Sequence, residues 1–213
     1  MPRLPLLIFL LLVLTSLALG FGIIYSTVEA NRRGDYLRLE NEVLRVDLPI
    51  SWFTILWEDI NETTNERIYY VITFPHDRFS VISIQVFDEK ATKQFLNEDD
   101  RIDLPSISFL QTQRFFYEWA SKKGENASII SVENGTLYVE ASGEKASYTR
   151  IHIKDGYKAD GSLYNVTVLV VSYMRNNNLV QISFWGKQED YEKNLEVFEW
   201  VLNNTLVKKY GPK

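Results

Sequence analysis

The sequence predicts an α+β fold, an antiparallel β-sheet packed by helices, that follows an N-terminal transmembrane or signal helix. Three observations predict it. Runs of alternating apolar residues recur along the chain, two stretches repeat apolar residues at helical spacing, and the first 25 residues are predominantly apolar. About 180 residues follow the apolar segment, which is enough for one domain with its own core. We expect an anchor or signal at 1–25, a linker at 26–36 and one domain at 37–208.

The N-terminal segment is long enough to cross a bilayer. Residues 4–25 carry no charge, and as a helix they would span about 33 Å, against about 30 Å for a bilayer core. A cleaved signal is the alternative, with 4–14 as its apolar region and Ala18-Leu19-Gly20 at the cut. The apolar tail at 21–25 favours a retained single-pass anchor, and the chain would be secreted if the segment is cleaved.

Orientation is predicted from glycosylation triplets, because Arg3 on one side and Arg32 with Arg33 on the other nearly balance the positive charge. Chance placement of the 14 Asn and 27 Ser or Thr residues predicts about two N-x-S/T triplets, and the chain has five. The acceptors are Asn61, Asn126, Asn134, Asn165 and Asn203. This surplus predicts an exported glycoprotein, with the domain outside the cytoplasm at the cell membrane.

Polar surroundings differ among the acceptors. Asn61, Asn126 and Asn134 fall in polar stretches or turns, so we expect glycans there first. Asn165 lies on an expected strand and must face solvent, and Asn203 must face away from the apolar stripe of its helix.

Strands are expected wherever apolar and polar residues alternate. The ranges are 37–48, 52–57, 67–74, 79–88, 129–133, 136–141, 146–154, 164–173 and 179–185. Within 79–88, Ile82, Ile84 and Val86 share one face. Asn134-Gly135 predicts a hairpin turn, and Asn176-Asn177-Asn178 predicts the turn between the last two long strands.

Two helices are expected. The first covers 106–122, with Ser106 as N-cap and Gly124 as its stop, and its apolar face would comprise Phe115, Phe116, Trp119 and Ala120. The second covers 189–206, where the stripe that faces the core is Tyr191, Leu195, Phe198, Leu202 and Leu206.

This order of elements resembles that of PsbP-like domains, the fold shared by the photosystem protein PsbP and a Ran-binding nuclear-import factor. The resemblance covers roughly 40–207. It is carried by "VDLPISWFTI" at 46–55, "YYVITF" with "FSVISIQVFDE", and the ending "YNVTVLVVSYMRNNNLVQISFWGKQEDYEKNLEVFEWVLNNTL". It implies an α/β/α sandwich that acts as a binding or accessory protein, with no catalytic motif to carry over. The membrane segment is a departure from PsbP, so we expect an exported, membrane-anchored form of the fold.

Residues with catalytic or metal-binding chemistry are sparse. His76 falls in a loop, and His152 alternates with apolar residues beside Arg150 and Lys154, so both are expected to be solvated surface histidines. The acidic residues Asp88, Glu89, Glu98, Asp99, Asp100 and Asp103 lack calcium-loop spacing and are expected in solvated loops. With no cysteine and no nucleophile or phosphate-loop motif, we expect no cofactor, no metal and no enzymatic activity.

Aromatic residues are abundant, and most are expected in the core, among them Trp119, Phe184 and Phe198. The aromatic residues expected to be more exposed are Trp52, Trp57, Tyr69 and Trp185. The net charge of −5 and the absence of a basic block argue against nucleic-acid binding.

The sequence therefore favours a membrane-anchored binding or accessory domain outside the cytoplasm, with a protein partner at the cell surface. One alternative is an extracytoplasmic hydrolase that acts on glycans through carboxylates the sequence does not pair. Another is a structural subunit of a cell-surface assembly.

Overall fold

The computed structural model of the chain describes residues 29–76, 79–120 and 126–210. The expected N-terminal anchor or signal at 1–25 lies outside these ranges. Within them, no helix is both long enough and apolar enough to span a membrane.

The domain contains two antiparallel sheets. The large sheet has seven strands in the spatial order β4 (Trp52–Ile60), β5 (Arg67–Pro75), β6 (Ser80–Phe87), β10 (Asn178–Lys187), β9 (Ser162–Arg175), β8 (Glu144–Ala159) and β7 (Ser128–Val139). The small sheet has the order β1 (Glu29–Arg33), β2 (Tyr36–Glu40), β3 (Leu44–Pro49) and β11 (Leu206–Val207). The helical segments are α2 (Glu89–Thr92), η1 (Lys93–Phe95), α3 (Leu104–Phe115), η2 (Phe116–Ala120), α5 (Gln188–Lys193) and α6 (Leu195–Asn203). The expected antiparallel sheet packed by helices is confirmed.

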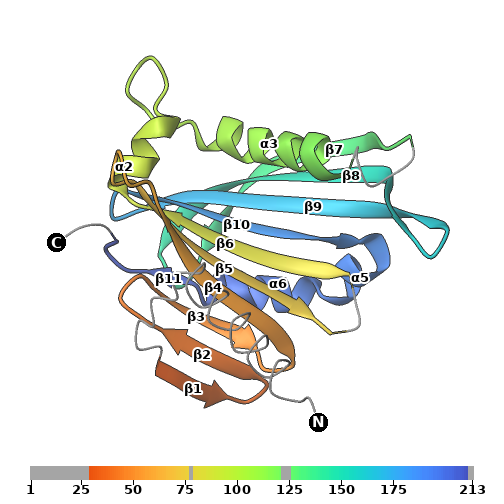
Figure 1. Ribbon diagram of the computed structural model, residues 1–213, viewed down its shortest axis with the longest axis horizontal. Helices are drawn as coiled ribbons and strands as arrows, with labels where there is room; N and C mark the ends of the chain where they lie inside the picture. The colour runs from red at the N-terminus through yellow and green to blue at the C-terminus, as the bar shows by residue number, and fades with distance from the viewer. Residues whose placement is uncertain (1–28, 77–78, 121–125, 211–213) are drawn as a thin grey trace, which may run out of the picture.

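The large sheet lies between two unlike layers (Figure 1). Helix α3 runs along one face, where it contacts β8 and β9. On the other face lie α5, α6 and the small sheet, and α6 contacts β3. Because α3 lies over the β8–β9 side, the same face of β4, β5 and β6 has no helix among the described residues above it.

The main core lies between the two sheets. Ile82, Ile84 and Val86 of β6 are fully buried there, and the expected shared face of these three residues is confirmed. On β10, Ile182 and Phe184 join the same cluster. A second cluster lies under α3 and comprises Ile151, Ile153, Val166, Val168 and Val170, with Phe115 and Phe116 packed against it. Alternate residues of each central strand therefore face different layers.

Several expected strand boundaries were wrong. The range 37–48 is not one strand but β2 and β3, because the Oδ1 atom of Asn41 accepts hydrogen bonds from the backbone N–H groups of Val43 and Leu44 and so forms a turn. The expected linker at 26–36 contains β1, which pairs with β2. The structured domain thus begins before residue 37.

The expected hairpin at Asn134-Gly135 is also wrong. Both residues lie inside the continuous strand β7, where they pair with Thr149 and Tyr148 of β8. A Cβ atom on Gly135 would lie 2.6 Å from the Tyr148 ring, so glycine makes room here for an aromatic neighbour rather than forming a turn. The expected turn at 176–178 is confirmed, since Asn176 and Asn177 both have positive φ angles.

The two expected helices exist but are divided differently. Helix α3 begins after Asp103, whose carboxylate accepts hydrogen bonds from the backbone N–H and the hydroxyl of Ser106, so Asp103 and not Ser106 is the N-cap. A π-helical turn, η2, ends it at Ala120, and the expected stop at Gly124 lies outside the described residues. The second helix is interrupted at Asn194, and its expected last member, Leu206, lies on β11.

Candidate functional site: a groove beside helix α3

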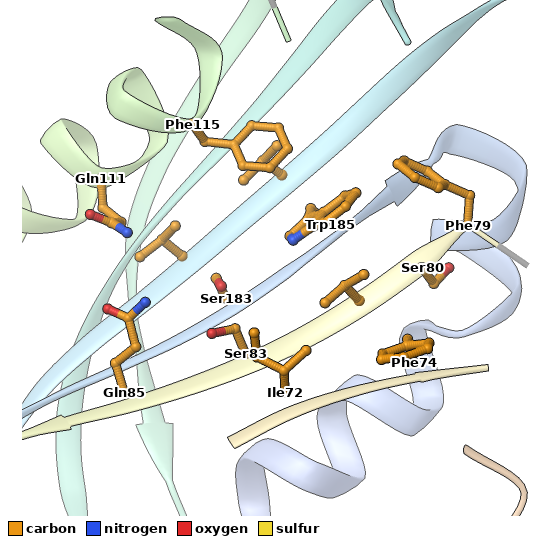
Figure 2. Close-up of a pocket in the computed structure, with 13 residues that line it drawn as sticks. Ile72, Phe74, Phe79, Ser80, Ser83, Gln85, Gln111, Phe115, Ser183 and Trp185 are labelled. Atoms are coloured by element: carbon orange, nitrogen blue, oxygen red, sulfur yellow. The ribbon is translucent and has the colours of Figure 1, made fainter. Parts of the chain in front are cut away.

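The largest hollow described lies where α3 stops covering the large sheet (Figure 2). Its volume is about 530 Å³. The lining comes from β5, β6, β9, β10, α3 and the residue before β6, and comprises Ile72, Phe74, Phe79, Ser80, Val81, Ser83, Gln85, Gln111, Phe115, Val168, Val170, Ser183 and Trp185. We refer to this hollow as the α3 groove.

Strand alternation determines which side chains face the α3 groove. On β6, Ile82 and Ile84 face the main core, so Ser83 and Gln85 face the opposite side, toward α3. On β10, the same alternation puts Phe184 in the core and Trp185 in the groove. The floor is therefore made by the residues that a two-sided strand leaves outside its main core.

One end of the α3 groove is aromatic. The ring centroids of Phe115 and Trp185 are 5.2 Å apart, and those of Phe79 and Trp185 are 4.8 Å apart. Phe79 also stacks on Tyr157 at 4.1 Å. In Figure 2 this aromatic cluster continues to Phe74 on β5. The cluster offers apolar ring surface to a ligand.

Four uncharged polar side chains lie toward the other end, and we call them the polar row. Ser83 and Ser183 are register partners on β6 and β10. Gln85 follows on β6, and Gln111 reaches in from α3 (Figure 2). Ser83 is only 8% exposed. No hydrogen bond from another described residue engages these four side chains, so their donors and acceptors are available to a molecule in the groove.

The apolar surface extends from the α3 groove to the edge strand β4. Phe53 and Ile55 of β4 lie opposite Phe74 and Ile72 of β5, and they are 47% and 52% exposed. A continuous open strip of this kind is the feature that marks interaction or ligand sites on protein surfaces.

Ionic groups lie at the rim and not in the lining. Tyr70, which lies opposite Gln85 on β5, has a pKa raised chiefly by burial and then by Asp59, while Arg114 of α3 acts in the opposite direction. Asp59 and Arg114 are both exposed. None of the thirteen lining residues is acidic, basic or a histidine. The lining therefore has no counter-charge for a charged ligand.

The structure places the two histidines far apart in character. His76 lies against the ring of Phe53, with centroids 3.6 Å apart, on the open strip. His152 is half-buried rather than solvated, and its Nδ1 atom lies 2.8 Å from the hydroxyl of Thr167. Burial, and then Arg150, lower the pKa of His152. Neither histidine lines the α3 groove.

The acidic residues cap helices or face solvent. Asp88 is fully buried, contrary to expectation, and its Oδ1 atom accepts a hydrogen bond from the backbone N–H of Ala91 at 2.7 Å as the N-cap of α2. Glu98, Asp99 and Asp100 are exposed. Among the residues the structure describes, no group of three or more acidic or histidine side chains has an arrangement that could hold a metal ion.

A second, more polar hollow lies at the start of α5. It is lined by Leu163, Tyr164, Asn165, Lys187, Gln188, Glu189, Asp190 and Glu192. The Nζ atom of Lys187 lies 3.8 Å from the centroid of the Tyr164 ring, a cation–π contact.

The expected glycosylation sites are mostly accessible. Asn61, Asn126, Asn134 and Asn165 are exposed, whereas Asn203 is half-buried. The Oδ1 atoms of Asn61, Asn134 and Asn165 accept hydrogen bonds, which leaves the amide nitrogen as the atom to which a glycan would be attached. In the Asn203 triplet, Thr205 is fully buried and donates its hydroxyl to the carbonyl of Val201. Glycosylation itself stays a prediction.

Sequence reasoning found part of the groove. It identified Trp185 as an exposed candidate, and Trp57 stacks on Tyr70 along the open strip, with centroids 4.6 Å apart. Tyr69, by contrast, is buried, and Trp52 packs against the main core. The polar row was missed. The signal available was a Ser or Gln at every second position of a strand whose other face is fully apolar.

No protein-family model matches the chain. No curated protein matches it either. Two solved structures are similar in fold. The solution structure of cyanobacterial PsbP from Synechocystis has a TM-score of 0.47 and 11% identity, covering 87% of this chain and 95% of that one. The crystal structure of LpqN, described as involved in cell envelope biogenesis of Mycobacterium tuberculosis, has a TM-score of 0.39 and 10% identity, covering 86% and 92%. Both TM-scores are below 0.5, and neither protein's role is transferred to this chain.

Proposed function

We propose that this chain is a non-enzymatic binding domain, tethered outside the cytoplasm by its N-terminal segment, that holds a small and mostly apolar ligand in the α3 groove. The observation that carries the proposal is the lining: aromatic and aliphatic side chains with a few uncharged polar groups, around a volume of about 530 Å³. Small-molecule sites have this composition and typically measure about 300–1,000 Å³.

The lining favours binding over hydrolysis. A glycan hydrolase uses two carboxylates on either side of the bond it cleaves, and the α3 groove has no carboxylate in its lining. The carboxylates of Glu189, Asp190 and Glu192 line the second hollow instead. A hydrolase would have to work there, away from the aromatic surface.

The open strip on β4 and β5 supports the same function. Exposed Phe53 and Ile55 extend the apolar surface beyond the groove, so a ligand longer than the groove would still lie on apolar side chains. A protein partner at the cell surface, which the sequence favours, would meet this strip when it loads or receives the ligand.

Photolabelling tests the proposal on the full chain in detergent. A neutral alkyl diazirine probe is activated by light, and mass spectrometry maps the labelled peptides. We expect label on peptides from β6, β10 and α3. The variant Ser183→Phe, which fills the groove, should remove that label, whereas Ser131→Phe on the exposed part of β7 should not. Label that is unchanged in Ser183→Phe, or confined to the N-terminal segment, would overturn the proposal.

The expected export is tested separately by glycopeptide mass spectrometry on protein from its native host. Glycans are expected first at Asn61, Asn126 and Asn134, which are all exposed. Five unmodified acceptors would remove the main support for an outward-facing domain.

A further inference from the structure

Within the proposed binding function, on which this step rests, we infer that the α3 groove selects an uncharged ligand whose polar group both donates and accepts hydrogen bonds. An amide or a hydroxyl at one end of an apolar chain has this chemistry. The polar group would lie on the polar row and the chain on the aromatic cluster.

The polar row has both kinds of hydrogen-bonding group. Gln85 and Gln111 each carry an amide N–H₂ that donates and a carbonyl that accepts, and the hydroxyls of Ser83 and Ser183 do both. Ser83 is more than nine-tenths buried and faces the groove without a hydrogen bond from another described residue. A ligand group that donates and accepts would satisfy these atoms, whereas a purely apolar ligand would cover them unpaired.

A charged ligand group is disfavoured at the same place. A carboxylate or an ammonium that leaves water needs an opposite charge beside it, and the lining has no ionisable side chain. The exposed rim residues Arg114 and Asp59 are of opposite sign, so they give the groove no net preference.

The orientation follows from the separation of the two ends. Gln85 and Gln111 lie together at one end in Figure 2, while Phe79 and Phe74 lie at the other, with the serines between them. Trp185 lies on the aromatic side of Ser183 along β10. The apolar chain of the ligand would therefore run from the polar row across Trp185 toward Phe79.

Competition against the alkyl diazirine probe tests this selectivity on the full chain in detergent. The competitors have the same chain length and end in a primary amide, a carboxylate or a methyl group. We expect the amide to displace the probe about three- to tenfold better than the alkane, as one or two net hydrogen bonds allow, and the carboxylate to displace it least.

The variant Gln85→Leu/Gln111→Leu should abolish the preference for the amide and keep the alkane's competition. Gln113→Leu, a matched change on the same helix outside the lining, should leave the preference intact. Comparing each competitor between variants cancels its partition into detergent. Probe labelling without any amide preference, or a preference that survives the double Leu variant, would overturn the inference. So would a carboxylate preference that Arg114→Gln removes. If the probe does not label the groove at all, the proposed function itself fails.

Discussion

Truncation of Phe198 tests the packing of α6 against the large sheet. The side chain is 1% exposed, and its ring stacks on Phe184 of β10 with centroids 5.0 Å apart and planes 7° apart. Phe184 stacks in turn on Tyr191 of α5 at 4.6 Å. Phe198→Ala removes the ring from the centre of this stack. Lost burial alone costs about 1.5–3 kcal/mol, and the cavity brings the total to about 3–5 kcal/mol.

That loss is a large share of the stability of a domain, which is typically about 5–15 kcal/mol. Urea unfolding followed by tryptophan fluorescence measures it as a lower midpoint at unchanged slope. Glu199→Ala, on the exposed side of the same helix, is the matched control and should stay within about 0.5 kcal/mol of the wild type. Leu202→Ala, also buried, should cost about 2–5 kcal/mol, and the half-buried Leu195 less. A loss below about 1 kcal/mol for Phe198→Ala would refute the packing described here.

Three further changes test other parts of the fold. Gly186→Ala should destabilise the domain by about 1–3 kcal/mol in the same unfolding assay, because a Cβ atom there would lie 2.6 Å from the carbonyl oxygen of Phe79; an unchanged midpoint would contradict this close approach. Asp47→Asn should cost about 3–5 kcal/mol, because buried Asp47 accepts a bidentate interaction from Arg38, with the Nε atom 2.6 Å from Oδ1; a neutral outcome would show that the pair contributes little. His152→Gln should flatten the dependence of stability on pH between about pH 5 and pH 8. Burial lowers the pKa of His152 in the folded chain from 6.5, so below that pH the unfolded chain binds a proton that the folded chain does not, and stability falls with pH; an identical pH profile in the variant would refute this.

The strands were predictable because alternation is a local property. Along 79–88, the apolar residues of β6 and their burial on one face could be predicted from the sequence alone. The failure at Asn134-Gly135 has an equally local cause. The dipeptide suits a turn, but it suits a strand as well when a large neighbour such as Tyr148 needs the space above a glycine. Only the partner strand decides between the two.

The α3 groove could not be predicted because it depends on where a helix ends its contact with a sheet. The pattern of β6 shows Ser83 and Gln85 on one face, which is equally consistent with a solvated surface. The register that pairs Ser83 with Ser183, 100 residues further along, and the position of Gln111 on α3 turn those residues into a lining. The sequence contains the residues of the site but not the tertiary arrangement that brings them together.

The order of strands in the large sheet also has a consequence for how the domain folds. Strands β4, β5 and β6 form one meander, and β7, β8, β9 and β10 form another, each with consecutive strands as neighbours. The two meanders join along one seam, β6 against β10, where the side chain of Asn178 donates a hydrogen bond to the carbonyl of Phe87 across 91 residues of chain. Pairing within each meander closes short loops, whereas the seam closes a long one, so its entropic cost falls late and on a single step. The residues on both sides of that seam, and not the turns, should therefore control the folding rate, and the groove, which straddles the seam, comes into existence only when the two halves meet.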